Sequence, residues 1–109
     1  MKIEKKVKSS PAKNKPNKDF PVVGLGVSAG GLEALKKFFK SIPSNTGIAF
    51  VVIQHLDPNH KSILSDLISR FTEMKVSQIV DGVKIKANTV FIIPPGFDVS
   101  LKNNRLMLD

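Results

Sequence analysis

The sequence contains no cysteine in its 109 residues, and it has no long apolar run. Without cysteine the chain can form neither disulfides nor a thiolate metal site, so a reducing compartment suits it. Its longest apolar run, residues 48–53, is far too short to cross a bilayer, and the amino terminus lacks the apolar stretch of a secretory signal. We therefore expect a cytoplasmic protein without membrane insertion.

Acidic residues are also scarce, with nine Asp and Glu against 17 Lys and Arg and a net charge of +8. Most of this charge lies in residues 1–19, where seven lysines face only Glu4 and Asp19. That segment has too few large apolar residues to offset its chain entropy, so we expect a disordered Lys-rich tail. The tail serves either as a solvated spacer or as a ligand for acidic surfaces. Residues 20–109 keep little excess charge, and we expect no nucleic-acid partner.

Apolar runs alternate with amphipathic stretches over residues 20–109, which we expect to form one folded unit. Predicted strands, from unbroken or β-rich apolar runs, lie at residues 20–26, 48–53, 76–80 and 89–93. Predicted helices, from apolar residues three and four apart, lie at residues 32–42 and 63–71. This alternation predicts an α/β fold with a mostly parallel, doubly wound (Rossmann-like) sheet flanked by helices. Functional sites in such folds lie at the carboxyl ends of the strands.

The end of the chain predicts a β-hairpin. Residues 99–102 and 105–108 flank Asn103-Asn104, a pair that tolerates the positive φ of a tight turn. We expect this hairpin to lie at an edge of a sheet that is incomplete at its carboxyl-terminal side.

A glycine-rich turn between the first strand and the first helix has two interpretations. Gly24, Gly26 and Ala29 fit the pattern GxGxxG/A, which favours a nucleotide-binding module. That fingerprint also needs an acid after the second strand, and Gln54-His55 stands there instead. No GK[ST] closes the loop, which excludes a phosphate-loop NTPase.

The alternative interpretation takes residues 26–30, GVSAG, as GxSxG, a sharp turn that exposes a serine at the top of a sheet. Ser28 then needs a base, and His55 directly follows the second strand just as Ser28 follows the first. The connection from the first helix to the second strand, around residues 43–47, is short, which predicts that the two strands are neighbours, about 4.8 Å apart. Taken singly, Ser28 could be a helix cap and His55 a loop histidine. His60 is expected to be solvated.

Three blocks resemble the catalytic domain of CheB-type chemotaxis protein-glutamate methylesterases: VVGLGVSAGGLEAL, FVVIQHLDPNHKSILSDLI and VFIIPPG. The similarity covers roughly residues 20–102. It implies that Ser28 and His55 are catalytic, that Ala29 and Gly30 supply oxyanion N–H groups, and that no cofactor or metal is needed. The implied substrates are glutamyl methyl esters, and for some members glutamines, on the cytoplasmic domains of methyl-accepting chemoreceptors.

The chain departs from that family pattern in two places. The family's third catalytic member is an Asp in a glycine-rich segment downstream of these residues, and none of the aspartates at 57, 66, 81 and 98 matches it. Many relatives carry a phosphorylatable receiver domain before the catalytic domain, whereas this chain has the Lys-rich tail at that place. We therefore expect a fragment, poorly active alone, of a protein with a methyltransferase domain fused downstream.

Three functions remain open at this point, in decreasing order of support. They are a serine methylesterase domain, a nucleotide-binding α/β module, and a noncatalytic adaptor whose tail docks on acidic receptor helices.

Overall fold

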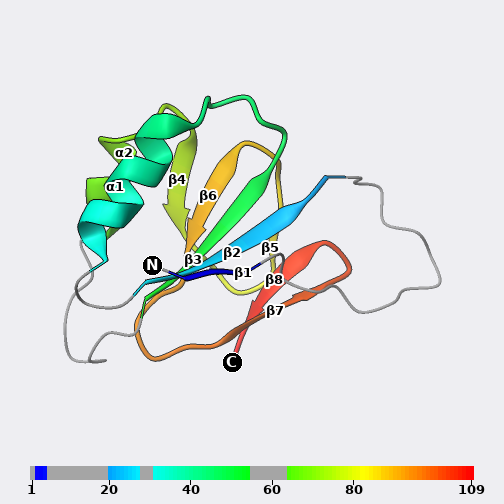
Figure 1. Ribbon diagram of the computed structural model, residues 1–109. Coiled ribbons are helices and arrows are strands. Elements are labelled where there is room, and N and C mark those ends of the chain that lie inside the picture. Colours follow the sequence, from blue (N-terminus) through cyan, green and yellow to red (C-terminus); the bar gives the residue numbers. More distant parts are fainter. Residues whose placement is uncertain (1, 5–19, 28–30, 55–63) are drawn as a thin grey trace.

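The computed structural model describes residues 2–4, 20–27, 31–54 and 64–109. These residues form two sheets and two helices, shown in Figure 1. The elements in chain order are β1 (Lys2–Glu4), β2 (Val22–Val27), α1 (Leu32–Ser41), β3 (Ala49–Gln54), α2 (Leu64–Ser69), β4 (Lys75–Gln78), β5 (Val83–Lys84), β6 (Thr89–Ile92), β7 (Val99–Lys102) and β8 (Arg105–Leu108).

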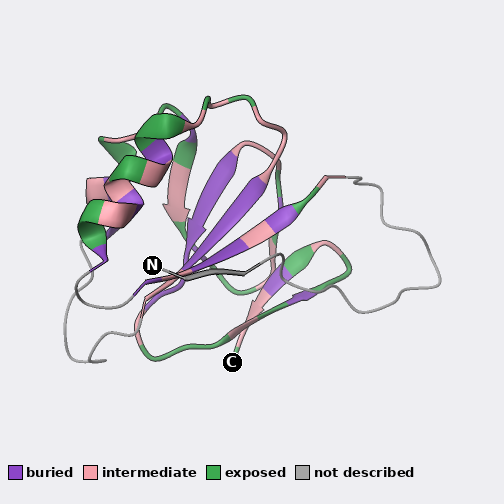
Figure 2. Ribbon diagram, viewed as in Figure 1, coloured by how far each residue is buried: buried purple, intermediate pink, exposed green. Residues whose placement is uncertain are grey.

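The larger sheet has the strand order β1-β2-β3-β6-β4. Its last four strands pair in parallel, and only β1 is antiparallel to its neighbour. The two central strands have the most apolar sequences, and most of their residues are buried (Figure 2). This is expected of parallel strands, because both of their faces are covered.

Helices cover one face of this sheet, and the smaller sheet covers the other. Leu35 and Phe39 of α1 and Ile68 of α2 pack with strand residues in one buried cluster. Leu101 of β7 and Leu106 of β8 belong to a second cluster on the opposite side of the strands. The larger sheet is therefore the middle of three layers, as Figure 1 shows. Neither described helix is long and apolar enough to span a membrane.

The predicted fold class is confirmed: a mostly parallel sheet is flanked by helices, and the chain ends in a hairpin. The hairpin does not extend the edge of the larger sheet, however. It joins β5 in a separate antiparallel sheet with the order β5-β8-β7. The physical reason is the alternation of its side chains, which points one apolar row at the uncovered face of the parallel strands.

Aromatic packing fixes α1 on the sheet. The ring of Phe39 is 1% exposed, and it meets the rings of Phe38 and Phe50 edge-on at centroid distances of 5.2 and 5.6 Å. Edge-on pairs of this kind add to the stabilisation from buried area. The ammonium group of Lys36 lies 5.7 Å from the centre of the Phe71 ring, so the helix also contacts the segment after α2. Phe39 is thus the largest fully buried side chain of the helical layer.

Two turns, the predicted hairpin turn and the turn before β5, have the backbone conformation that their residues favour. Asn103 and Asn104 have φ angles of 52° and 65°, as both central residues of a type I′ hairpin require. Gly82 has φ 84° in the turn before β5, and the Val83 N–H donates to the Val80 carbonyl across that turn at 2.9 Å. The Asn103-Asn104 turn sets the register between β7 and β8.

The amino terminus differs from the prediction of a disordered tail at one place. Lys2–Glu4 forms β1, with Ile3 opposite Leu25 of β2. A sheet edge offers unpaired backbone groups to any extended segment nearby, and β1 satisfies those of β2. Residues 5–19 lie outside the described residues, so the prediction stays untested there.

Candidate active site

The carboxyl ends of β2 and β3 lie side by side. The two strands are parallel neighbours, and their last residues, Val27 and Gln54, are register partners. The predicted adjacency of these strands is therefore confirmed. In the sequence, Ser28 follows Val27 and His55 follows Gln54. Ser28 and His55 themselves lie outside the described residues, so their predicted roles stay predictions.

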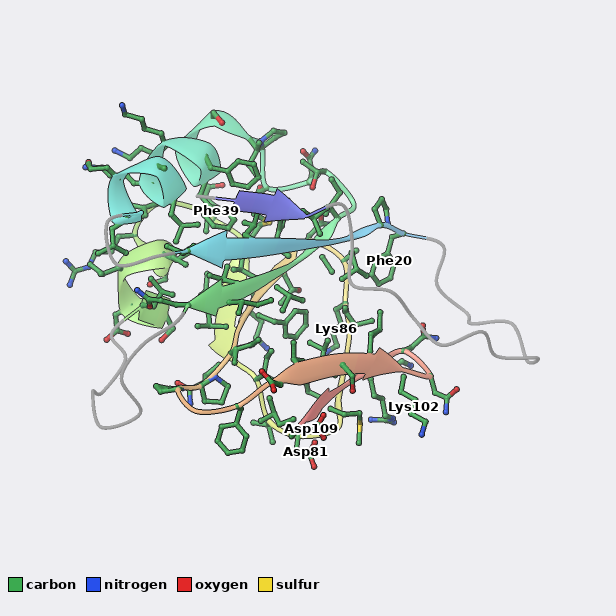
Figure 3. The ribbon with its side chains drawn as sticks, turned by 60° about the horizontal axis from the view of Figure 1, so that its bottom comes forward. Phe20, Phe39, Asp81, Lys86, Lys102 and Asp109 are labelled. Atoms are coloured by element: carbon green, nitrogen blue, oxygen red, sulfur yellow. The ribbon has the colours of Figure 1, made fainter. Side chains whose placement is uncertain are left out.

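The amino end of α1 lies at the same edge of the sheet. Figure 3 shows β2 and β3 running side by side and ending on the side where α1 begins. The helix starts at Leu32, and buried Gly31 accepts the first helical hydrogen bond, from the Leu35 N–H, at 3.0 Å. Within residues 2–4, 20–27, 31–54 and 64–109, no side chain caps this terminus. The first N–H groups and the positive dipole end of a helix attract anions. The predicted oxyanion residues Ala29 and Gly30 lie outside the described residues.

The loop after β6 continues this edge beyond β3. The Ile93 N–H donates to the Val52 carbonyl at 3.0 Å, which extends the pairing of β3 and β6 past the last strand residue. Pro94 is buried, Gly96 has φ 84°, and the Phe97 side chain is 47% exposed. The sequence prediction included the PPG block of this loop but not Phe97 itself. Its only signal in the sequence is a large apolar residue directly after a turn.

Other polar residues of the described part have structural roles. An oxygen of the Asp81 carboxylate accepts a hydrogen bond from the Leu108 N–H at 2.8 Å. Asp98 and Asp109 pair through their backbone groups at the end of the hairpin. These contacts give Asp81 and Asp98 structural roles in the smaller sheet. Among residues 2–4, 20–27, 31–54 and 64–109, no cluster of three or more His, Asp or Glu side chains could hold a metal ion.

Comparison with known proteins identifies relatives over most of the chain. A family model described as CheB methylesterase matches residues 23–109. A protein-glutamate methylesterase/protein-glutamine glutaminase of Bacillus subtilis is 30% identical over 98 residues, which are 90% of this chain and 28% of that protein. The protein of the same description from Oceanobacillus iheyensis is 29% identical over 82 residues, which are 75% of this chain and 23% of that protein.

A solved structure agrees with these relatives. The crystal structure of the Thermotoga maritima CheB methylesterase catalytic domain superposes with a TM-score of 0.69 at 26% sequence identity. The match covers 83% of this chain and 49% of that domain. The present chain therefore spans about half of the solved catalytic domain, and less than a third of each of the two curated relatives described above.

Proposed function

Because the chain belongs to the CheB methylesterase family, we propose that it carries the serine and histidine of a protein-glutamate methylesterase. The proposed substrates are glutamyl methyl esters, and also glutamines, on the cytoplasmic domains of chemoreceptors. The observation that supports this assignment best is the register pair Val27 and Gln54, because each residue directly precedes one of the two proposed catalytic residues.

Register matters because a serine hydroxyl is a weak nucleophile without a base within hydrogen-bond reach. Neighbouring parallel strands are about 4.8 Å apart, and an imidazole spans that gap. A shift of the pairing by two residues would move the two positions apart by roughly 6.6 Å along the strands. The observed register contains no such shift, since Val27 and Gln54 are directly opposite.

In the proposed reaction, Ser28 Oγ attacks the γ-carbonyl carbon of the ester while His55 accepts the hydroxyl proton. The tetrahedral intermediate collapses, the C–O bond to the methoxy group breaks, and methanol leaves with the proton from His55. Water, deprotonated by His55, then attacks the acyl-serine carbonyl. The bond to Ser28 Oγ breaks, the oxygen regains the proton from His55, and the receptor side chain is left as a glutamate. Backbone N–H groups of Ala29 and Gly30, which precede the start of α1 in the sequence, are the proposed donors to the oxyanion.

The third catalytic group, an aspartate that orients His55, has no match among residues 1–109. In serine hydrolases its loss lowers kcat by about 10⁴. We propose that the part of the catalytic domain that this chain does not span supplies it. The predicted fused methyltransferase domain stays a prediction.

If Ser28 and His55 lie in this chain and the orienting aspartate lies in the rest of the catalytic domain, two proteins should differ greatly in activity. One is the 109-residue chain, and the other is a chimaera in which the remaining part of the Thermotoga maritima domain follows residue 109. The chimaera is expected to release methanol from a methylated receptor fragment about 10⁴ times faster than the chain alone, because only the chimaera contains the orienting carboxylate. Equal rates, or no methanol from a folded chimaera, would contradict the proposal.

The nucleotide-binding alternative receives no support from the described residues. Gln54, half-buried, ends β3 where a ribose-binding fold would place an acid.

A further inference from the structure

The outer face of the smaller sheet carries three cations in one row. Arg105 of β8 is the register partner of Lys84 on β5 and of Lys102 on β7. Residues directly opposite in antiparallel strands point to the same face, so the three side chains form one row across the sheet. All three are exposed. We call Lys84, Arg105 and Lys102 the basic row.

The row faces solvent because its neighbours along each strand face the core. The adjacent register row is Val83, Leu106 and Leu101, and these residues pack against the parallel strands. The alternation of a strand then points the basic row outward. The Asn103-Asn104 turn, with positive φ at both residues, fixes the two hairpin strands that hold Arg105 and Lys102.

Like charges directly opposite each other destabilise a sheet, and nothing in the described part of the chain neutralises this row. None of its members forms an ion pair with a described carboxylate. Arg105 donates one hydrogen bond, from Nη1 to the Gly82 carbonyl at 2.8 Å, so the described residues leave most of its donors without an acceptor. Figure 3 shows Asp81 and Asp109 together, and Lys102 apart from them near the turn.

We propose that the basic row is a docking surface for an acidic α-helix of a protein partner. Opposing side chains across antiparallel strands have Cβ atoms about 4.5–5.5 Å apart. Helix positions i, i+4 and i+7 present side chains at a similar spacing, about 5–6 Å. A helix that crosses β5, β8 and β7 can therefore place one carboxylate at each cation. This inference does not depend on the proposed catalytic function.

The make-up of the face favours a helix over nucleic acid. The other residues of β7 and β8 that share the outward face are Ser100 and Met107, so the hairpin offers no aromatic ring for base stacking. Single-stranded nucleic acids bind where cations and such rings occur together. A row of isolated cations instead matches separate carboxylates, with Arg105 able to hold one of them through two parallel hydrogen bonds.

The test is an NMR titration of the 109-residue chain with two alanine-rich helical peptides. One peptide has Glu at positions i, i+4 and i+7, and the other has Gln at the same positions. The Glu peptide is expected to shift the backbone signals of β5, β7 and β8, and the Gln peptide is not. The double variant Lys84→Glu and Lys102→Glu is expected to lose about tenfold in affinity, equivalent to about 1.4 kcal/mol, as for two exposed ion pairs.

The matched control is Lys40→Glu with Lys75→Glu, which changes the net charge equally at two exposed positions on α1 and β4. This control is expected to bind the Glu peptide like the wild type. Equal loss in both double variants would overturn the proposal, because it would mean that net charge alone drives binding. Failure of the wild type to bind the Glu peptide would also overturn the proposal. The same holds if poly-U RNA or phosphatidylserine vesicles bind the wild type more strongly than the Glu peptide does, and lose that binding in the Lys84→Glu, Lys102→Glu variant. Unchanged strand signals in unbound Lys84→Glu, Lys102→Glu protein verify that it is folded.

Discussion

Replacing Ser28 by alanine is expected to lower kcat for methyl-ester hydrolysis by roughly 10⁵–10⁶ in the active chimaera. The alanine has no oxygen that can form the acyl intermediate, so only the oxyanion donors and substrate binding continue to assist direct attack by water. The loss corresponds to about 7–8 kcal/mol of activation free energy. Methanol release from a methylated receptor fragment measures it.

The matched variants separate catalysis from folding. His55→Ala is expected to cause a similar loss, and the Ser28→Ala, His55→Ala double variant should be no worse than either single one, because the two residues act as a unit. Ser100→Ala, at an exposed position on β7, is expected to retain full activity. Unchanged turnover in either Ser28→Ala or His55→Ala would refute the assigned roles.

Replacing Phe39 by alanine is expected to cost about 3–5 kcal/mol of the free energy of unfolding. The ring is 1% exposed and meets both Phe38 and Phe50, so its removal loses buried area, two ring contacts and the close packing of α1 on the sheet. Domains of this size are stable by about 5–15 kcal/mol, so the loss is a large share of the total. The midpoint and slope of urea unfolding measure it.

The control for Phe39 is Leu32→Ala on the same helix. Leu32 is 38% exposed at the first position of α1, and alanine has the highest helix propensity. We expect this variant to differ from the wild type by well under half of the Phe39→Ala effect. A Phe39→Ala variant that unfolds within about 1 kcal/mol of the wild type would contradict the packing described for the helical layer.

The main layers of the fold could be predicted because their signals are local. The apolar runs of β3 and β6 and the three- and four-residue spacing around Leu35 and Phe39 each appear within one short window of sequence. The smaller sheet could not be predicted as a layer. Its strand β5 has only two residues, Val83–Lys84, which is too short for any periodicity. The paired residues of its partner β8 come more than 20 residues later in the sequence.

For the candidate site, too, local sequence features could be predicted and contacts between distant residues could not. The order of residues along the chain suggested that Ser28 and His55 follow adjacent strands, and the register pair Val27 and Gln54 confirms that β2 and β3 are neighbours. The basic row was missed because Lys84, Lys102 and Arg105 are unremarkable in sequence. Only the pairing of three strands brings them together, and pairing depends on contacts between distant residues that no sequence window contains.

The most direct test of the account is a disulfide between positions 28 and 55. The chain has no cysteine, so a Ser28→Cys, His55→Cys variant contains one possible intramolecular bond, which mass spectrometry after proteolysis detects. Disulfides form readily when Cα atoms are about 4.4–6.8 Å apart, as at neighbouring strand ends. A control pair, Ser28→Cys with Ser41→Cys, places the second thiol at the far end of α1. We predict rapid oxidation of the first pair and none of the control; a 28–55 pair that stays reduced, or oxidises no faster than the control, would contradict the convergence of Ser28 and His55.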